Sequence, residues 1–222
     1  MLFRSKNTLI AATVGALLAG FAVASVGYKK EQAEKPAPAA DPARTALLER
    51  KGAQRIGSES AKVVIVEFFD PACETCAQFA PRMKELVQQS GGRVAVIERY
   101  APLHPKSDEV SALVEAAAKQ DRYAEALDVL FTHQSEWATH EGPKLDVAMG
   151  LLEKAGIDIV RLDADKNDPA VRAAVAEDIA DHTALGVTQT PEFFVNGRPL
   201  PSWGWRQLNE LVAEEAQRQY GG

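Results

Sequence analysis

Two cysteines separated by two residues are the feature of this 222-residue chain best suited to chemistry. Cys73 and Cys76 are its only cysteines, and they follow the almost wholly apolar run Val63–Phe69. Such a run predicts a buried strand, and the residues after it have helical spacing, so Cys73 should open a helix. Free N–H groups and the helix dipole at that position favour the thiolate. Because the thiolate attacks disulfides, Cys76, one turn on, could close a disulfide with Cys73 or resolve a mixed one.

A lone pair of this spacing also fits less reactive interpretations. Structural zinc needs about four ligands, and the chain has two cysteines, while His133 and His140 are separated by more than the usual three to five residues. A purely structural disulfide across so short a loop would remove little chain entropy. Two inert buried cysteines stay an alternative, against which the strand-to-helix position argues.

The elements around the pair predict a βαβ unit. The strand Val63–Phe69 is apolar enough to be buried on both faces. One apolar stripe then recurs at three- and four-residue spacing up to Gly91-Gly92, formed by Cys76, Phe79, Ala80, Met83, Leu86 and Val87. Arg93–Tyr100 is the next expected strand, and the crossover between the strands should be right-handed.

The remainder predicts helices and then a hairpin. From Ser107 to about Leu185 the spacing is helical, with Asp168-Pro169 as a helix start. The strand Glu192–Val195 leads into Asn196-Gly197, a strong hairpin signal. Its return strand, Arg198–Pro201, contains proline and therefore belongs at a sheet edge.

Short helices complete the plan at both ends of this region. Thr45–Arg50 should form one before the first strand, and an amphipathic stripe from Leu208 to Ala216 predicts another at the end. The order is therefore βαβ, a helical insertion, and ββα, which is an α/β plan.

The segment Val63–Pro81 resembles the active-site region of the DsbA-like branch of the thioredoxin superfamily. An acid, Glu67, stands six residues before the first cysteine, and Pro81 stands five residues after Cys76. Far along the chain, Thr190-Pro191 before a strand resembles the cis-proline loop of that family. The resemblance covers roughly residues 56–217.

This resemblance implies a thioredoxin fold at residues 44–222, a central mixed sheet flanked by helices, with a helical insertion at about 105–186. It assigns Cys73 as the nucleophile and Cys76 as the buried resolving cysteine. Glu67 would exchange a proton with Cys76. Pro191 would be cis, which sets the Thr190 backbone opposite the sulfurs, where an extended substrate could pair with it.

Two departures from the best-known members concern the direction of electron flow. The dipeptide between the cysteines is Glu74-Thr75 instead of Pro-His. A carboxylate beside Cys73 should disfavour the thiolate and make the disulfide less oxidising. Thr190 before the proline is more similar to isomerase-type members. Oxidase, reductase and isomerase directions all stay open.

The amino-terminal residues 1–28 predict a signal anchor or a cleaved signal peptide. An uncharged run at residues 8–27 is long enough to cross a bilayer as a helix of about 30 Å, while Ala22 and Ala24 form an A-x-A-like cleavage pattern. Residues 29–43 are a proline- and alanine-rich linker. We expect the main domain on the periplasmic side of a bacterial inner membrane, tethered or secreted.

Charge and composition limit the partners. Residues 1–40 carry five basic and two acidic side chains, so the rest of the chain has a net charge of −9. An acidic domain without a basic stripe argues against nucleic-acid binding. The expected partners are cysteines of exported proteins and a membrane redox protein that recycles the pair. The chain should be a monomer without metal or cofactor.

Two other functions also fit the cysteine pair. A dithiol that carries a soft metal such as Cu(I) is the main alternative, and a tethered interaction domain with a vestigial motif is the next. His104 follows the second expected strand and could face the active site, but it is assigned to a surface turn. His182 is assigned to half-buried packing. Trp203 and Trp205 are assigned to hairpin and core packing.

Overall fold

The computed structural model describes residues 42–221. The expected signal segment 1–28, with its possible membrane run 8–27, and nearly all of the linker 29–43 lie outside the described residues. Within 42–221 no helix combines the length and the apolarity needed to cross a membrane. The boundaries assigned to the amino-terminal segments therefore stay predictions.

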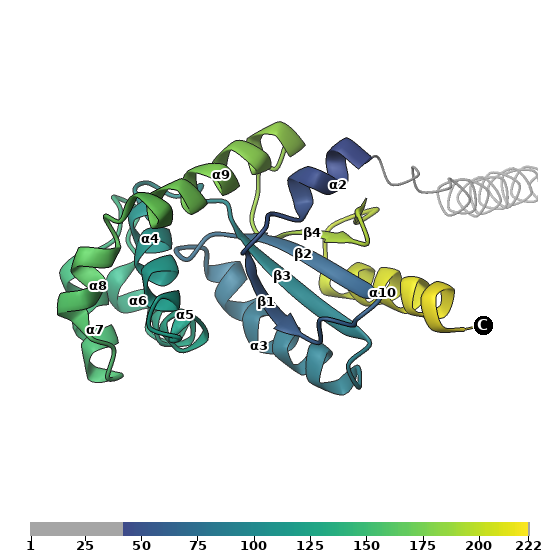
Figure 1. Cartoon of the computed structure of the whole chain (residues 1–222), viewed down its shortest axis with the longest axis horizontal. Coiled ribbons are helices and arrows are strands. Elements are labelled where there is room, and N and C mark those ends of the chain that lie inside the picture. Colours follow the sequence, from purple (N-terminus) through teal and green to yellow (C-terminus); the bar gives the residue numbers. More distant parts are fainter. Residues whose placement is uncertain (1–41, 222) are drawn as a thin grey trace, which may run out of the picture. The chain divides into compact units, whose positions relative to one another are not determined.

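The fold is a five-stranded mixed sheet flanked by helices, with strand order β1-β3-β2-β4-β5 (Figure 1). In the centre, β2 (Val63–Phe69) pairs in parallel with β3 (Val94–Tyr100). β4 (Glu192–Val195) lies antiparallel to the other side of β2. The expected α/β thioredoxin plan, with its buried central strand, is thereby confirmed.

Antiparallel strands close the sheet on both sides. β1 (Gln54–Gly57) pairs with β3 and had not been predicted from the sequence. β5 is shorter than expected, at Arg198–Pro199, and occupies the edge that its proline predicts. Asn196 and Gly197 between β4 and β5 both have positive φ, as a tight hairpin turn requires.

Each face of the sheet has its own core. On one face lie α3 (Glu74–Gln89) and α10 (Trp205–Tyr220), and on the other α2 (Pro42–Leu48) and α9 (Pro169–Leu185) (Figure 1). The α3 stripe buries Phe79, Met83 and Val87 against β2 and β3. Pro81 lies inside α3, where it lacks the N–H of a regular helical turn.

The helical insertion forms a third core at the carboxyl ends of β2 and β3. Its elements are α4 (Ser107–Ala118), α5 (Tyr123–Thr132), α6 (Gln134–Trp137), α7 (Leu145–Lys154), α8 (Ile159–Asp165) and the first half of α9. The predicted start of α9 is confirmed, because Asp168 accepts the Ala170 N–H and Pro169 follows it. This core includes Phe69, Tyr100 and both cysteines. The redox pair therefore lies at the junction of the sheet and the insertion.

A buried ion network joins β3 to the helices on the far face. Asp178 on α9 is fully buried and accepts hydrogen bonds from Arg50 Nε, Arg99 Nε and the Tyr100 N–H. Arg99 is also fully buried, and its Nη1 donates to the Leu47 and Leu48 carbonyls that end α2. Every donor nitrogen of Arg99 has a partner, because Nη2 reaches Asp181. The network thus ties α2, β3 and α9 together.

Removing the Asp178 carboxylate should strongly destabilise the fold. Asp178→Ala leaves two arginines without their shared buried anion, and breaking a buried pair in this way costs about 3–5 kcal/mol. The measurement is the free energy of unfolding in urea. Asp163→Ala is the matched control, because that carboxylate is 62% exposed and pairs with Lys166 at the surface. Similar free energies of unfolding for the two variants would contradict the anchoring role of the network.

Candidate active site

Cys73 is the N-cap residue of α3, and its Sγ lies over the first helical turn. The Cys76 N–H donates to Cys73 Sγ at 3.4 Å. The Cys73 N–H donates to the Asp70 carbonyl at 3.0 Å, which closes the turn between β2 and α3. The expected position of the first cysteine at a helix N-terminus is therefore present, and it sets free N–H groups toward the sulfur.

The pKa of Cys73 is lowered to about 6 from an ordinary value of 9.0. The main cause is the hydrogen bond from the Cys76 thiol. Burial opposes it, and the Thr190 hydroxyl and the backbone N–H groups of Cys76 and Thr75 lower the pKa further. A thiolate is thus the dominant form of Cys73 at neutral pH. The cysteines are not joined to each other.

Cys76 has the opposite character. Only 1% of it is exposed, and burial, followed by the hydrogen bond to Cys73, raises its pKa well above the ordinary value. The helix places it one turn behind Cys73 and inside the core of the insertion. The pair therefore consists of one acidic thiol and one protonated, buried thiol.

The loop before β4 approaches the same sulfur from the other side. The Thr190–Pro191 peptide bond is cis, as the resemblance implied. The protonated Cys73 thiol donates to the Thr190 carbonyl oxygen at 3.3 Å. Residues 117 positions apart thus meet, and a half-buried Thr190 borders the sulfur as expected.

Glu67 lies in β2 on the face that carries the cysteines. It is 4% exposed, and its pKa is raised well above the ordinary 4.5, first by burial, then by Glu98 and Cys73. Glu98 is its direct neighbour in the parallel register, and burial raises the pKa of Glu98 to about 7. Glu67 also contributes to the raised pKa of Cys76. The neutral form of Glu67 is therefore favoured, and its carboxyl group interacts electrostatically with both sulfurs.

The dipeptide between the cysteines lies at the surface of α3. Glu74 is exposed and Thr75 is half-buried, and both line a cavity that also contains Cys73. The expected disfavouring of the thiolate by Glu74 does not dominate, because the pKa of Cys73 falls instead of rising. The Thr75 N–H adds to this lowering.

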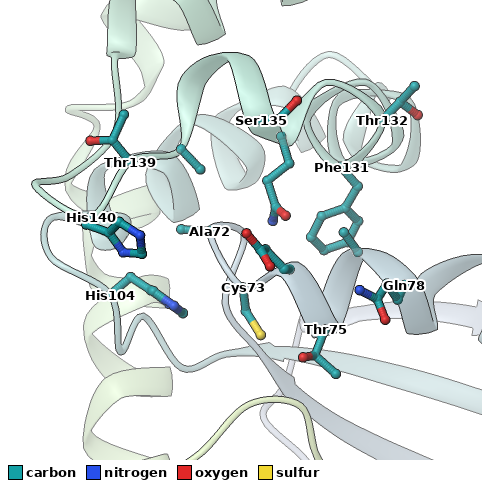
Figure 2. Close-up of a pocket in the computed structure, with 14 residues that line it drawn as sticks. Ala72, Cys73, Thr75, Gln78, His104, Phe131, Thr132, Ser135, Thr139 and His140 are labelled. Carbon is teal, nitrogen blue, oxygen red and sulfur yellow. The ribbon is translucent and has the colours of Figure 1, made fainter.

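The cavity beside Cys73 has a volume of about 720 Å³ and separates α3 from the insertion. Figure 2 shows Phe131 and Gln78 on one side of it and His104 and His140 on the other. Most of its lining side chains are polar, among them Thr132, Ser135 and Thr139. It therefore offers a polar surface next to the acidic thiol.

His104 has both of the positions that its place after the second strand suggested. The residue is in a surface-exposed turn as predicted, but its imidazole also lines the cavity of Cys73. Its Nδ1 lies 2.8 Å from Asp70 Oδ2, a fully buried carboxylate that directly follows β2. Sequence reasoning missed Asp70 entirely. The signal was available, because Asp70 and His104 follow two parallel strands, and the carboxyl ends of such strands meet at one edge.

Trp205 has the packing role expected from the sequence, whereas His182 and Trp203 differ from their expected positions. His182 is 7% exposed and so more buried than expected, while Trp205 packs against the core beneath α3. The Trp203 ring lies tilted against that of Phe79, with ring centroids 5.5 Å apart, but 48% of Trp203 is exposed. Its Nε1 donates to the Pro191 carbonyl oxygen at 3.1 Å. Trp203 is thus a half-exposed neighbour of the cis-proline loop and is not core.

Metal ligands do not gather around the pair. Within the described part of the chain, no three histidine, cysteine, aspartate or glutamate side chains form a group able to hold a metal ion. The copper-carrier alternative therefore gains no supporting observation.

Comparisons with solved structures give the fold independent support. A thioredoxin-like oxidoreductase from Silicibacter pomeroyi DSS-3 superposes with a TM-score of 0.68 at 23% identity, over 81% of this chain and 99% of that chain. Oxidised BdbD from Bacillus subtilis matches with a TM-score of 0.66 at 20% identity, over 75% and 94%. Alpha-DsbA1 from Wolbachia pipientis matches with a TM-score of 0.67 at 18% identity, over 79% of this chain and 96% of that chain. The fold is therefore that of DsbA-like oxidoreductases.

Curated relatives match over a shorter stretch. The Na(+)/H(+) antiporter NhaA of Herminiimonas arsenicoxydans is 33% identical over 144 residues, which is 65% of this chain and 22% of the antiporter. An antiporter of the same name from Salinispora arenicola is 30% identical over 145 residues. The chain spans about a fifth of the length of these relatives.

A family model described as thioredoxin matches residues 49–214, about three quarters of the chain. The matched range runs from the residues before β1 into α10 and includes both cysteines, Glu67 and the cis-proline loop. On this match, the chain belongs to the thioredoxin family.

Proposed function

We propose that the chain is a thiol–disulfide oxidoreductase that exchanges disulfides with cysteines of exported proteins through Cys73 and Cys76. The observation that carries the proposal is the unequal pair at the start of α3. Cys73 has its pKa lowered to about 6, while burial keeps Cys76 protonated. One sulfur is ready to attack or to be attacked, and the other can resolve the mixed disulfide.

The pair favours giving its disulfide away. Hydrogen bonds that stabilise the Cys73 thiolate exist only in the reduced form, so they stabilise the dithiol relative to the disulfide. Stabilising the reduced form makes the disulfide a better oxidant. We therefore propose that electrons flow from substrate thiols to the Cys73–Cys76 disulfide, which a membrane redox partner then restores.

The proposed place of action is the periplasmic side of the inner membrane. It rests on the uncharged run at residues 8–27 and on a periplasmic thioredoxin-like protein from Salmonella enterica with a TM-score of 0.62 at 23% identity. The antiporter activity in the names of the curated relatives is not proposed for this chain, because the match covers about a fifth of their length.

In the proposed cycle the substrate thiolate attacks Cys73 Sγ of the disulfide, and the Cys76 sulfur leaves with the electron pair. Glu67, whose raised pKa favours its protonated form, gives its proton to the leaving Cys76 sulfur, and the raised pKa of Cys76 favours accepting it. A second substrate thiolate then displaces Cys73. The substrate gains a disulfide, the enzyme becomes a dithiol, and the Cys73 thiolate rests on the helix N-terminus.

The two cysteines should be separable by substitution. Cys73→Ser should abolish exchange, because it removes the only acidic thiol. Cys76→Ser should accumulate mixed disulfides, because the resolving sulfur is gone. Non-reducing gels of the protein mixed with a reduced, unfolded cysteine-containing protein measure both outcomes. Full exchange activity in either variant would disprove the assignment.

The thiolate of Cys73 should titrate near pH 6. Because its pKa is depressed on folding, the stabilisation of the reduced form is complete above the ordinary value of 9.0 and is lost as the pH falls through about 6. Cys76→Ala removes the largest cause of the lowering and should move the midpoint toward 9.0. The ultraviolet absorbance of the thiolate measures it. A midpoint near 9 in the unsubstituted protein would contradict the proposed direction.

Replacing Glu67 should change the pH dependence of exchange without removing the nucleophile. Glu67→Gln cannot supply a proton to Cys76, so release of that sulfur should slow, while alkylation of Cys73 should continue. Glu74→Gln is the matched control, since Glu74 is exposed. Stopped-flow rates of reduction of the Cys73–Cys76 disulfide across the pH range measure the difference. An unchanged profile in Glu67→Gln would remove this role.

The pH dependence of the free energy of unfolding also tests whether Glu67 is buried. Because its pKa is raised on folding, the unsubstituted protein should lose stability as the pH rises from 4.5 through the raised value. Glu67→Gln should show a smaller loss when urea unfolding is followed at several pH values, because only the contribution of Glu98, whose pKa is also raised, then remains. An equal loss in the two proteins would contradict the burial of an ionisable Glu67.

A further inference from the structure

Asp70 connects the loop before Cys73 to the segment after β3. Its Oδ1 accepts the Ala72 N–H at 2.8 Å, and its backbone carbonyl accepts the Cys73 N–H at 3.0 Å. Its Oδ2 accepts the His104 N–H at 2.8 Å and the Ser107 hydroxyl at 3.0 Å, and it also lies 2.8 Å from His104 Nδ1. The carboxylate is completely buried. It therefore holds the His104 ring in a fixed position relative to Cys73.

The contact with Asp70 sets the tautomer of His104. An ionised carboxylate can only accept, so Nδ1 carries the hydrogen and donates it to Oδ2. Nε2 is then an acceptor in the neutral ring and a donor in the imidazolium. It makes no hydrogen bond to residues 42–221, and 45% of the side chain is exposed. An oriented ring with a free nitrogen thus lines the cavity that contains Cys73 (Figure 2).

Three sulfurs take part in each exchange step: those of Cys73, Cys76 and the substrate. In the proposed cycle only the substrate sulfur has no group that takes or gives its proton. Cys73 is the central sulfur and is stable as a thiolate, and Glu67 lies close to Cys76. Cys73 lines the cavity, so a substrate sulfur that reaches Cys73 through the cavity passes beside His104. An aliphatic thiol holds its proton at neutral pH and is a poor leaving group as a thiolate. A proton carrier on the cavity side would therefore accelerate its reaction.

We propose that Asp70 and His104 act as a proton-carrying pair for the substrate sulfur. This inference rests on the proposed function. When a substrate thiol attacks, neutral Nε2 takes its proton, and the thiolate forms a bond to Cys73 Sγ while the bond from Cys73 to Cys76 breaks. In the reverse direction, the Cys73 thiolate attacks a substrate disulfide, its S–S bond breaks, and the leaving thiolate takes the proton from the imidazolium. Two sulfurs are oxidised and two reduced in each complete exchange.

The other titratable side chains of the cavity do not have this arrangement. Glu74 is exposed and carries a negative charge, which opposes an approaching thiolate. His140 lines the cavity but has no hydrogen bond to the described residues, so nothing fixes its ring. His104 alone among these three is held by a buried carboxylate. His140 is therefore a suitable control.

His104→Asn keeps a side-chain donor that can reach Asp70 and removes the free ring nitrogen. The reduced protein, with Cys73 as the attacking thiolate, is mixed with either of two small disulfides. One is bis(2-hydroxyethyl) disulfide, whose leaving thiol is weakly acidic. The other is dithiobis(nitrobenzoate), whose leaving aromatic thiolate is stable without a proton. His140→Asn is measured in parallel, together with the alkylation rate of Cys73 by iodoacetamide.

We expect His104→Asn to lower the second-order rate constant with the hydroxyethyl disulfide about 10²-fold, the lower range for general acid catalysis. The rate with the aromatic disulfide and the alkylation rate should change less than about twofold, and His140→Asn should match the unsubstituted protein. Equal losses with both disulfides, or no loss with either, would overturn the role of His104. If the unsubstituted protein reacts with neither disulfide, the proposed function itself fails.

Discussion

The hydrogen-bonded contact of Cys76 with Cys73 Sγ, made by the Cys76 thiol and by the Cys76 N–H, is the interaction on which the site depends. It exists because β2 ends at Phe69 and α3 begins after a tight turn, so the sulfur replaces the usual capping oxygen. The first turn of a helix has N–H groups without helical partners, and a thiolate satisfies them better than a thiol. Two contacts hold this turn in place. The Asp70 carbonyl accepts the Cys73 N–H, and the Thr190 carbonyl lies against Cys73 Sγ.

Magnitudes explain why Glu74 does not reverse this effect. An exposed carboxylate about 4 Å away in water repels another charge by roughly 1 kcal/mol, and salt screens it further. Hydrogen bonds to charged groups contribute about 1.5–3 kcal/mol each, and several reach Cys73 from Cys76, Thr75 and Thr190. Local hydrogen bonds therefore outweigh the charge of the neighbouring residue. The dipeptide Glu74-Thr75 is therefore a poor guide to the direction of electron flow, because the charge of Glu74 is weaker than the hydrogen bonds to Cys73.

Much of the fold was predictable because its signals are local. The α3 stripe, the Asp168-Pro169 start and the Asn196-Gly197 turn each depend on residues a few positions apart. β1 escaped prediction because its four residues have no strong apolar pattern and gain their place only by pairing with β3, some 40 residues on. The cysteines, Glu67 and Pro191 were found by resemblance. The place of His104 after the second strand suggested that it could face the site. Asp70 was not found, since its contact with His104 arises only when β2 and β3 align in parallel.

Buried carboxylates on one face of the sheet give a second view of the site. Glu67 and Glu98 are direct cross-strand neighbours, and both are almost completely buried. Two ionised groups there would repel each other at low dielectric, so at most one can be charged at neutral pH without a large cost. Glu98, whose pKa is about 7, is the one that can ionise, and its charge further raises the pKa of Glu67. Burial first, and the charge of Glu98 second, therefore favour the protonated form of Glu67, which is the form that can give a proton to the Cys76 sulfur.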